Sequence, residues 1–126
     1  MYLYFMNFSE EEIHHIGMNF IGEELQNLGY EFLGVNSKLQ KHPQFVIFKS
    51  GEPITFVMVQ TVLYPEDFVE VPKIAEKVIS HAKTQDSSVW FAGIGLCDAD
   101  DHNKPILRGN PYKILFNGFK ILHTHV

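Results

Sequence analysis

The densest group of residues that could carry chemistry is the segment Cys97-Asp98-Ala99-Asp100-Asp101-His102. Its carboxylates and imidazole are ligand types that bind divalent cations. The spacing, however, fits no established ligand pattern, since an EF-hand loop needs a glycine at its sixth position and a glutamate at its twelfth, and neither is in register. We therefore interpret this segment as a solvated turn, with a metal site as the alternative.

Other candidate side chains are scattered along the chain. Glu24 falls near the middle of the apolar face of a predicted helix, where a carboxylate needs a partner, so it is either a relocated acid facing a cleft or a residue at the rim of the core. His14 and His15 are adjacent and so point in different directions on a helix. His123 and His125 would share one face of a strand and could bind a transition metal, but a solvent-facing pair is the simpler interpretation.

Nucleophilic and phosphate-loop chemistry find no support in the sequence. Cys97 follows an apolar stretch without a recognisable base, and no serine stands in a nucleophile elbow. Gly93 and Gly95 lack the further glycine and the following helix of a phosphate-binding loop.

Composition indicates an ordinary globular protein. The chain has 126 residues, of which 45% are hydrophobic and 20% charged, which predicts a single domain over residues 1–126. A chain of this size can bury a core without disulfides or a structural metal, and its single cysteine cannot form an internal bridge. No apolar run is long enough to span a membrane, and the apolar start lacks the basic flank of a signal peptide. We therefore expect a soluble, cytoplasmic protein.

The charge argues against a dedicated nucleic-acid binder. Ten Lys and Arg residues stand against fifteen Asp and Glu residues, and Arg108 is the only arginine. Nucleic-acid backbones are held by clustered cations, whereas these are dispersed among acids. A local basic face stays open, because net charge does not describe a surface.

The patterning predicts a mixed α/β sheet with a helix on each face. A capping box of Ser9 and Glu12 should start a helix that ends near Leu28, before Gly29. Strands follow at 30–35 and 44–48, and the turn 50–53 joins the second of these to a buried strand at 54–63 as a hairpin. A helix should begin at Pro72, and its predicted apolar face comprises Ile74, Ala75, Val78, Ile79 and Ala82.

The remaining elements are a strand at 89–96 and a final strand at 119–123, while 112–116 could be either a strand or a short helix.

Six residues in this order carry a resemblance to a known group of proteins: Gly17, Leu25, Gly29, Tyr30, Asn36 and Lys38. They match the start of small bacterial proteins related to Holliday-junction resolvases, which belong to the restriction-endonuclease-like superfamily. In that superfamily the PD-(D/E)xK motif places an Asp on one strand of a hairpin and Glu-x-Lys on the next. The resemblance covers about residues 12–96 and implies a mixed central sheet, including a β-hairpin, with helices on both faces.

The catalytic residues of that motif are replaced here. The helical Glu falls on Met18, the Asp on Gln44 (or on Phe45 without a gap), the motif Glu on Met58 and the Lys on Gln60. Magnesium prefers carboxylate and water ligands, which Met and Gln do not supply. We therefore assign no catalytic residue, no metal and no cofactor, and expect an inactive nuclease-like domain with a binding or assembly role.

The replaced positions have two interpretations. Met18 and Met58 could simply fill core volume. Alternatively, the vacated cleft binds an uncharged ligand or a partner peptide through Gln44 and Gln60. The apolar run from Tyr2 to Phe8 and the 13% aromatic content suggest a homodimer, or a segment that covers a sheet edge within the chain.

Two further alternatives make geometric predictions. A metal-dependent nuclease with a rebuilt site requires several of five side chains to converge: Glu24, Glu52, Asp98, Asp100 and His102. A nucleic-acid-binding pseudo-nuclease requires a continuous basic face, formed from Lys38, Lys41, Lys49, Lys83 and Arg108.

Overall fold

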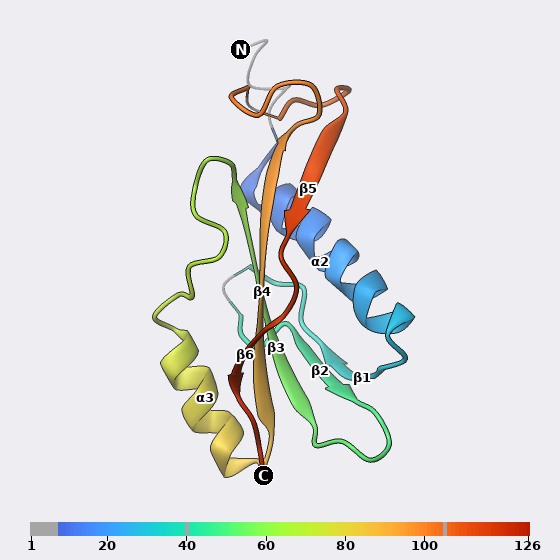
Figure 1. The fold of residues 1–126 in the computed structure, drawn as a ribbon, viewed down its shortest axis with the longest axis vertical. Coiled ribbons are helices and arrows are strands. Elements are labelled where there is room, and N and C mark those ends of the chain that lie inside the picture. Colours follow the sequence, from blue (N-terminus) through green and yellow to red (C-terminus); the bar gives the residue numbers. More distant parts are fainter. Residues whose placement is uncertain (1–7, 40, 105) are drawn as a thin grey trace.

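The computed structural model describes residues 8–39, 41–104 and 106–126, so the expectation for the apolar run from Tyr2 lies almost wholly outside the described residues. The elements run from a long first helix to a short last strand (Figure 1). In chain order they are α2 (Glu10–Asn27), β1 (Glu31–Val35), β2 (Phe45–Phe48), β3 (Thr55–Leu63), α3 (Ala75–Thr84), β4 (Ser88–Asp98), β5 (Tyr112–Phe116) and β6 (Lys120–His123).

The strands form one six-stranded mixed sheet. Its order is β1-β2-β3-β4-β5, with β6 also paired to β4. The central strands β3 and β4 are parallel along the whole of β3, and the other pairs are antiparallel. β5 pairs with the end of β4 and β6 with its beginning, so the two short strands follow each other along β4 (Figure 1). The predicted hairpin of β2 and β3 is confirmed, and residues 112–116 form a strand.

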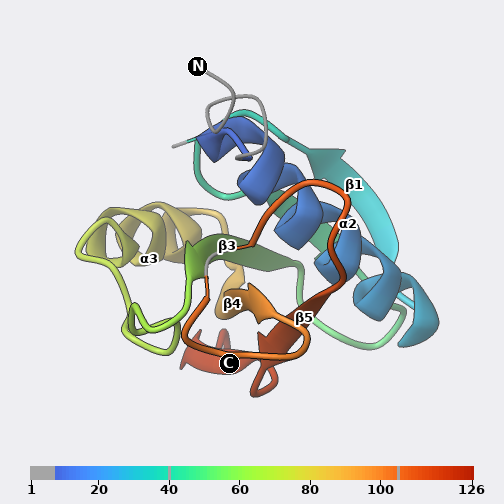
Figure 2. The same cartoon turned by 90° about the horizontal axis from the view of Figure 1, so that it is seen from above.

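The two helices cover opposite faces of the sheet, as the sequence predicted (Figure 2). Side chains alternate between the faces along each strand, so β3 contributes to two cores. Val57 and Val59 pack under α2 with Met18, Ile21 and Leu25. Phe56 and Met58 pack under α3, whose buried residues are Ala75, Val78 and Ala82. No helix of the described residues is long and apolar enough to cross a membrane.

The predicted bounds of α2 are confirmed by its caps. The Ser9 hydroxyl accepts a hydrogen bond from the Glu12 amide at 3.2 Å, and the Glu12 carboxylate accepts one from the Ser9 amide at 2.9 Å. Both fill groups that a helix start leaves unpaired. At the other end Gly29 takes a positive φ of 89°, which favours glycine and turns the chain into β1.

The predicted start of α3 is wrong by about one turn. The Pro72 carbonyl accepts a hydrogen bond from the Ala75 amide at 3.0 Å, which closes a turn, but the helix itself begins at Ala75. Ile74 is the N-cap residue and provides no side-chain cap. Because it precedes the first helical turn, Ile74 does not join the buried face, and its side chain is 37% exposed.

Glycines allow close contacts on both faces of the sheet. A Cβ on Gly17 of α2 would lie 1.8 Å from Oγ1 of Thr61, so this glycine lets the helix approach β3. A Cβ on Gly93 would lie 1.7 Å from the Phe68 carbonyl oxygen. The Gly93 position therefore serves packing of the segment after β3.

Two alanine substitutions in the same helix should change stability in opposite directions. Gly22→Ala adds a Cβ at an ordinary 3.6 Å from Phe45 and should raise the free energy of unfolding by up to about 1 kcal/mol, because alanine is the better helix former. Gly17→Ala must displace Thr61 or the helix and should lower it by roughly 1–3 kcal/mol. Urea unfolding measures both, and equal stabilisation by the two variants would contradict the packing of α2 on β3.

Candidate functional site

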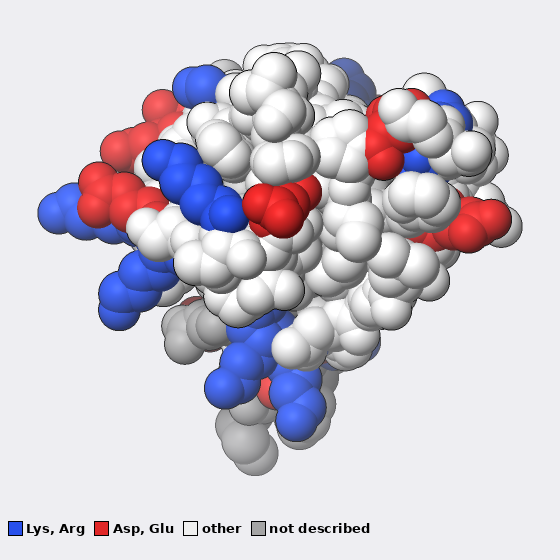
Figure 3. Space-filling model, turned by 90° about the horizontal axis from the view of Figure 1, so that it is seen from below, with Lys and Arg blue, Asp and Glu red and all other residues white. Residues whose placement is uncertain are grey.

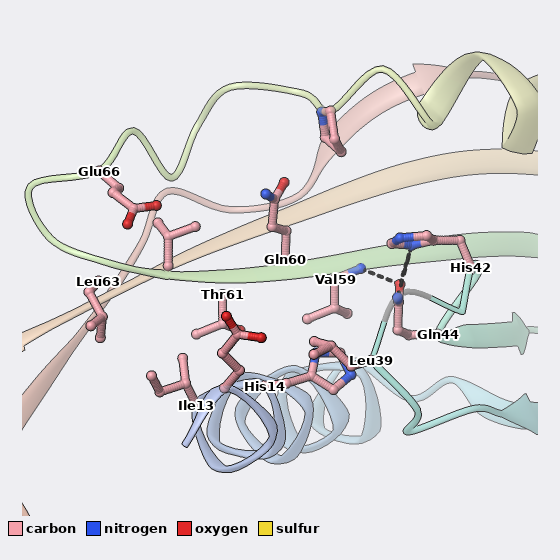
Figure 4. Close-up of a pocket in the computed structure, with 13 residues that line it drawn as sticks. Ile13, His14, Leu39, His42, Gln44, Val59, Gln60, Thr61, Leu63 and Glu66 are labelled. Atoms are coloured by element: carbon pink, nitrogen blue, oxygen red, sulfur yellow. Dashed lines mark hydrogen bonds between the residues drawn. The ribbon is translucent and has the colours of Figure 1, made fainter. Parts of the chain in front are cut away.

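A pocket lies beside the part of β3 that extends beyond its pairing with β2. β2 pairs with β3 from Thr55 to Val57, and no other described strand continues along that edge to Leu63. The pocket fills this position and has a volume of about 380 Å³ (Figure 4). Its lining comes from four segments: Glu10, Ile13 and His14 of α2; Leu39, His42 and Gln44 before β2; residues 59–63 of β3; and Glu66 and Pro72 after β3.

Gln44 replaces the missing strand with its side chain. Its backbone amide donates to the Val57 carbonyl at 3.1 Å, which is the last backbone bond from this segment to β3. Two residues further along β3, the Val59 amide donates to Oε1 of Gln44 at 2.7 Å. The side chain is 1% exposed. An unpaired buried amide costs free energy, so this hydrogen bond stabilises the open strand edge.

The same amide group orients His42. Nε2 of Gln44 donates to the Lys41 carbonyl at 2.9 Å, which together with the Val59 bond fixes which end of the amide is nitrogen. Nδ1 of His42 lies 2.9 Å from Nε2 and 3.1 Å from Oε1 of the same amide, so this contact restrains the ring whichever ring nitrogen carries the proton.

Three buried side-chain polar atoms in the described part of the chain have no hydrogen-bond partner, and all three belong to residues that line this pocket. They are Nε2 of His14, Oε1 of Gln60 and Oγ1 of Thr61. His14 is 4% exposed and comes from the first turns of α2. Gln60 and Thr61 are neighbours on β3, so their side chains leave opposite faces of the sheet and reach the pocket around its edge. Figure 4 shows Gln60 and His14 on opposite sides of β3.

His14 is held neutral by its surroundings. Burial lowers the pKa of His14 below its usual value, and the nearby rings of His15 and His42 lower it further, against a smaller opposing effect from a hydrogen bond to the Ser37 backbone. The ring is therefore uncharged at neutral pH. Because Nε2 has no partner, the hydrogen bond to the Ser37 backbone must come from Nδ1–H. In the neutral ring Nε2 then carries no proton and is an acceptor.

The pocket wall combines acceptors with apolar surface. Ile13, Leu39 and Val59 supply apolar surface, and two carboxylates, those of Glu10 and Glu66, belong to exposed residues of the lining. No Lys or Arg of the described residues lines the pocket. The site therefore suits a neutral ligand that donates hydrogen bonds and disfavours an anion.

Of the four residues that the resemblance aligns with the nuclease motif, the structure brings two together. Gln44 and Gln60 line the pocket. Met18 is buried in the core under α2, and Met58 is completely buried in the core under α3, on the other face of the sheet. Of the polar groups in the pocket, His14 and Thr61 were not singled out as ligands from the sequence. The available signal for His14 was its place on the helical stripe of Met18, Ile21 and Leu25, where a polar residue is unusual.

The side chains of the rebuilt nuclease site do not converge. Glu52 accepts a hydrogen bond from the Tyr30 hydroxyl at 2.9 Å in the turn before β3, whereas Asp98 ends β4 at the far end of the sheet, roughly 30 Å away by strand length. The Asp98 carboxylate accepts hydrogen bonds from the amides of Asp100 and Asp101, both at 3.0 Å, and so closes a turn. Glu24 is half-buried and does not line the pocket. No group of three His, Cys, Asp or Glu residues within the described ranges could hold a metal ion.

Two of the five cations proposed for a basic face lie at opposite ends of α2. Arg108 pairs with Glu12 in the first turn of α2, whereas Lys49 donates to the Leu28 carbonyl just beyond its last turn. The helix between them has 18 residues and is about 27 Å long. On the face seen in Figure 3, some Lys and Arg side chains adjoin one another, but acidic and uncharged side chains separate these groups, so the face is not continuously basic.

The burial of His14 should make stability fall in acid. Because its pKa in the folded protein lies below the ordinary value of 6.5, the unfolded chain takes up a proton first, and stability is lost as the pH falls below about 6.5. Urea unfolding between about pH 8 and about pH 5.5 should show a smaller loss for His14→Gln than for the wild type. His15→Gln, at the exposed neighbouring position, is the control. Equal losses for all three proteins would contradict the buried neutral ring.

Comparison with known proteins gives one match. A family model described as "Domain of unknown function (DUF8840)" matches residues 11–122. No curated protein and no solved structure matches the chain. The match runs from the first turn of α2 into β6 and includes the whole lining of the pocket beyond Glu10. The chain therefore belongs to the DUF8840 family, a domain of unknown function.

Proposed function

We propose that this protein is a non-catalytic binding domain of restriction-endonuclease-like type, and that the pocket beside β3 holds a small uncharged ligand. The order of helix, strand, hairpin, helix and parallel strand supports the superfamily assignment. Two positions of its motif, Gln44 and Gln60, line one pocket at the hairpin. Their amide groups cannot compensate the charge of a bound Mg²⁺, but they can pair with polar groups of a ligand.

The unpaired atoms of His14, Gln60 and Thr61 are the observation that carries this proposal. Each buried polar atom without a partner costs about 1–3 kcal/mol, and native structures contain few of them. Here all three belong to residues that line one pocket, whereas both polar atoms of the buried Gln44 side chain have hydrogen bonds, to the Lys41 carbonyl and from the Val59 amide. A ligand that forms hydrogen bonds with these atoms removes that unfavourable free energy, which favours binding.

The positions of acceptors define the ligand. Nε2 of His14 and Oε1 of Gln60 require donors, while the Thr61 hydroxyl can donate or accept. Apolar wall residues such as Leu39 and Val59 suit a flat or compact carbon skeleton. The volume of about 380 Å³ lies in the range of small-molecule sites. We therefore assign an amide or an amino-substituted ring as the ligand class.

Benzamide and benzoate test this assignment because they share a shape and differ in their donors and charge. Titration followed by ¹H–¹⁵N NMR should show benzamide shifting the amides of Val59 and Thr61. Benzoate offers no donor and meets the carboxylates of Glu10 and Glu66, so its affinity should be lower by about tenfold or more, a difference of roughly 1.4 kcal/mol.

A matched pair of variants locates the site. Gln60→Leu should remove most of the preference for benzamide over benzoate, whereas Gln85→Leu, at the exposed end of α3, should leave it unchanged. Failure of benzamide to shift the pocket amides, or equal binding of the two compounds, would contradict the proposal.

Assembly through β1 is a second candidate function. β1 is an edge strand of the sheet, and its side chains Leu33 and Val35 are 54% and 60% exposed. Open strand edges with apolar side chains are surfaces on which a second chain can add a strand. Light scattering should then show a dimer that Val35→Lys dissociates, with Ile121→Lys on β6 as the control. A monomer at all concentrations would contradict this function.

A further inference from the structure

A second cavity adjoins the pocket and has the opposite charge. It lies between residues 41–43 and one side of α3, has a volume of about 290 Å³, and is called the basic groove below. Its ionisable lining residues are Lys41, His42, Lys77 and His81. No Asp or Glu of the described residues lines it. The remaining wall is apolar and comprises Pro43, Ile74 and Val78.

The groove's donors come from two elements. Lys77 and His81 are one helical turn apart and so share a side of α3. The His81 ring packs on Phe56, with ring centroids 5.8 Å apart, which restrains the imidazole. On the opposite wall, the Gln44 amide contacts Nδ1 of His42 and so restrains this ring as well. Two restrained imidazoles and two flexible ammonium groups therefore surround the groove.

His42 connects the two cavities because it lines both. On the pocket side of this residue the charged lining residues are Glu10 and Glu66, and on the groove side they are Lys41 and Lys77. A single ligand that crosses His42 would meet acceptors at one end and cations at the other. The pocket alone would also bind a simple amide, and the basic groove alone would also bind a simple anion, so only the two cavities together select such a ligand.

We propose that the basic groove binds an oxyanion, carried as a phosphate or carboxylate group by the same ligand whose uncharged end occupies the pocket. This inference rests on the proposed function for the identity of the uncharged end, but the groove's own chemistry is independent of it. Lysine binds phosphate as a point charge, and an imidazole N–H donates directly to an anionic oxygen. The ligand is then a molecule with an amide or amino-substituted ring at one end and an oxyanion at the other.

Inorganic phosphate is the probe for the groove. In ¹H–¹⁵N NMR titrations at constant ionic strength, it should shift the amides of Lys77, Val78 and His81 in a saturable manner. Replacement of Lys77 by Gln removes one nearby charge and should weaken phosphate binding by roughly fivefold, as should Lys41→Gln. Lys83→Gln, an exposed lysine of the same helix outside the groove, should change it by less than about twofold. These positions are exposed, so the variants should fold.

Parallel titrations with acetate distinguish the two oxyanion sources. Tighter binding of phosphate than of acetate assigns a phosphate ester, and the reverse assigns a carboxylate. Absence of saturable shifts with both anions, or equal weakening by Lys77→Gln and Lys83→Gln, would overturn the groove site.

Phosphate and benzamide together separate this inference from the proposed function. Saturating phosphate should leave benzamide bound in the pocket, because the two probes occupy different cavities. Displacement of benzamide by phosphate would overturn the two-cavity arrangement. Phosphate binding without benzamide binding would refute the proposed function and support the oxyanion site in the basic groove. Benzamide binding without phosphate binding would refute the oxyanion site alone.

Discussion

The length difference between β2 and β3 is the constraint on which the candidate site depends. β3 is paired on both edges only over its first three residues, while β4 accompanies it to its end. A strand edge that continues without a partner exposes amide and carbonyl groups that must be paired in another way. Here the buried Gln44 side chain accepts a hydrogen bond from the Val59 amide, and its amide group also contacts Nδ1 of His42. Gln44 and the residues with unpaired atoms line the pocket, and His42, which Gln44 contacts, lines both the pocket and the basic groove.

The open edge also explains how one pocket collects side chains from both faces of the sheet. In a strand with neighbours on both sides, Gln60 and Thr61 would be separated by the sheet itself. At an open edge both reach the same space, and α2 adds His14 because Gly17 lets the helix approach Thr61 closely. The resulting chemistry is hydrogen bonding by uncharged groups. In the PD-(D/E)xK motif, to which we propose that Gln44 and Gln60 correspond, the chemistry is metal binding by carboxylates.

Local signals in the sequence predict much of the fold, and long-range contacts decide the rest. The capping box, Gly29 and the turn at 50–53 act within a few residues, and the first helix and the hairpin are confirmed. α3 begins one turn later than Pro72 suggests, because a turn precedes the helix. Sequence reasoning selected Gln44 and Gln60 as hydrogen-bonding groups, but it could not place His14 in the same pocket. That proximity depends on α2 packing against a strand more than 40 residues away.

A crystal structure determined with benzamide tests the central claim most directly. The account predicts one benzamide molecule beside β3, with its amide nitrogen donating to Oε1 of Gln60 or Nε2 of His14 and its ring against Leu39 and Val59. The hydrogen bonds of Gln44 to Val59 and Lys41 should be unchanged, because they belong to the strand edge. Benzamide bound elsewhere, or a pocket in which Gln60 and His14 pair with other groups of the chain, would contradict the account.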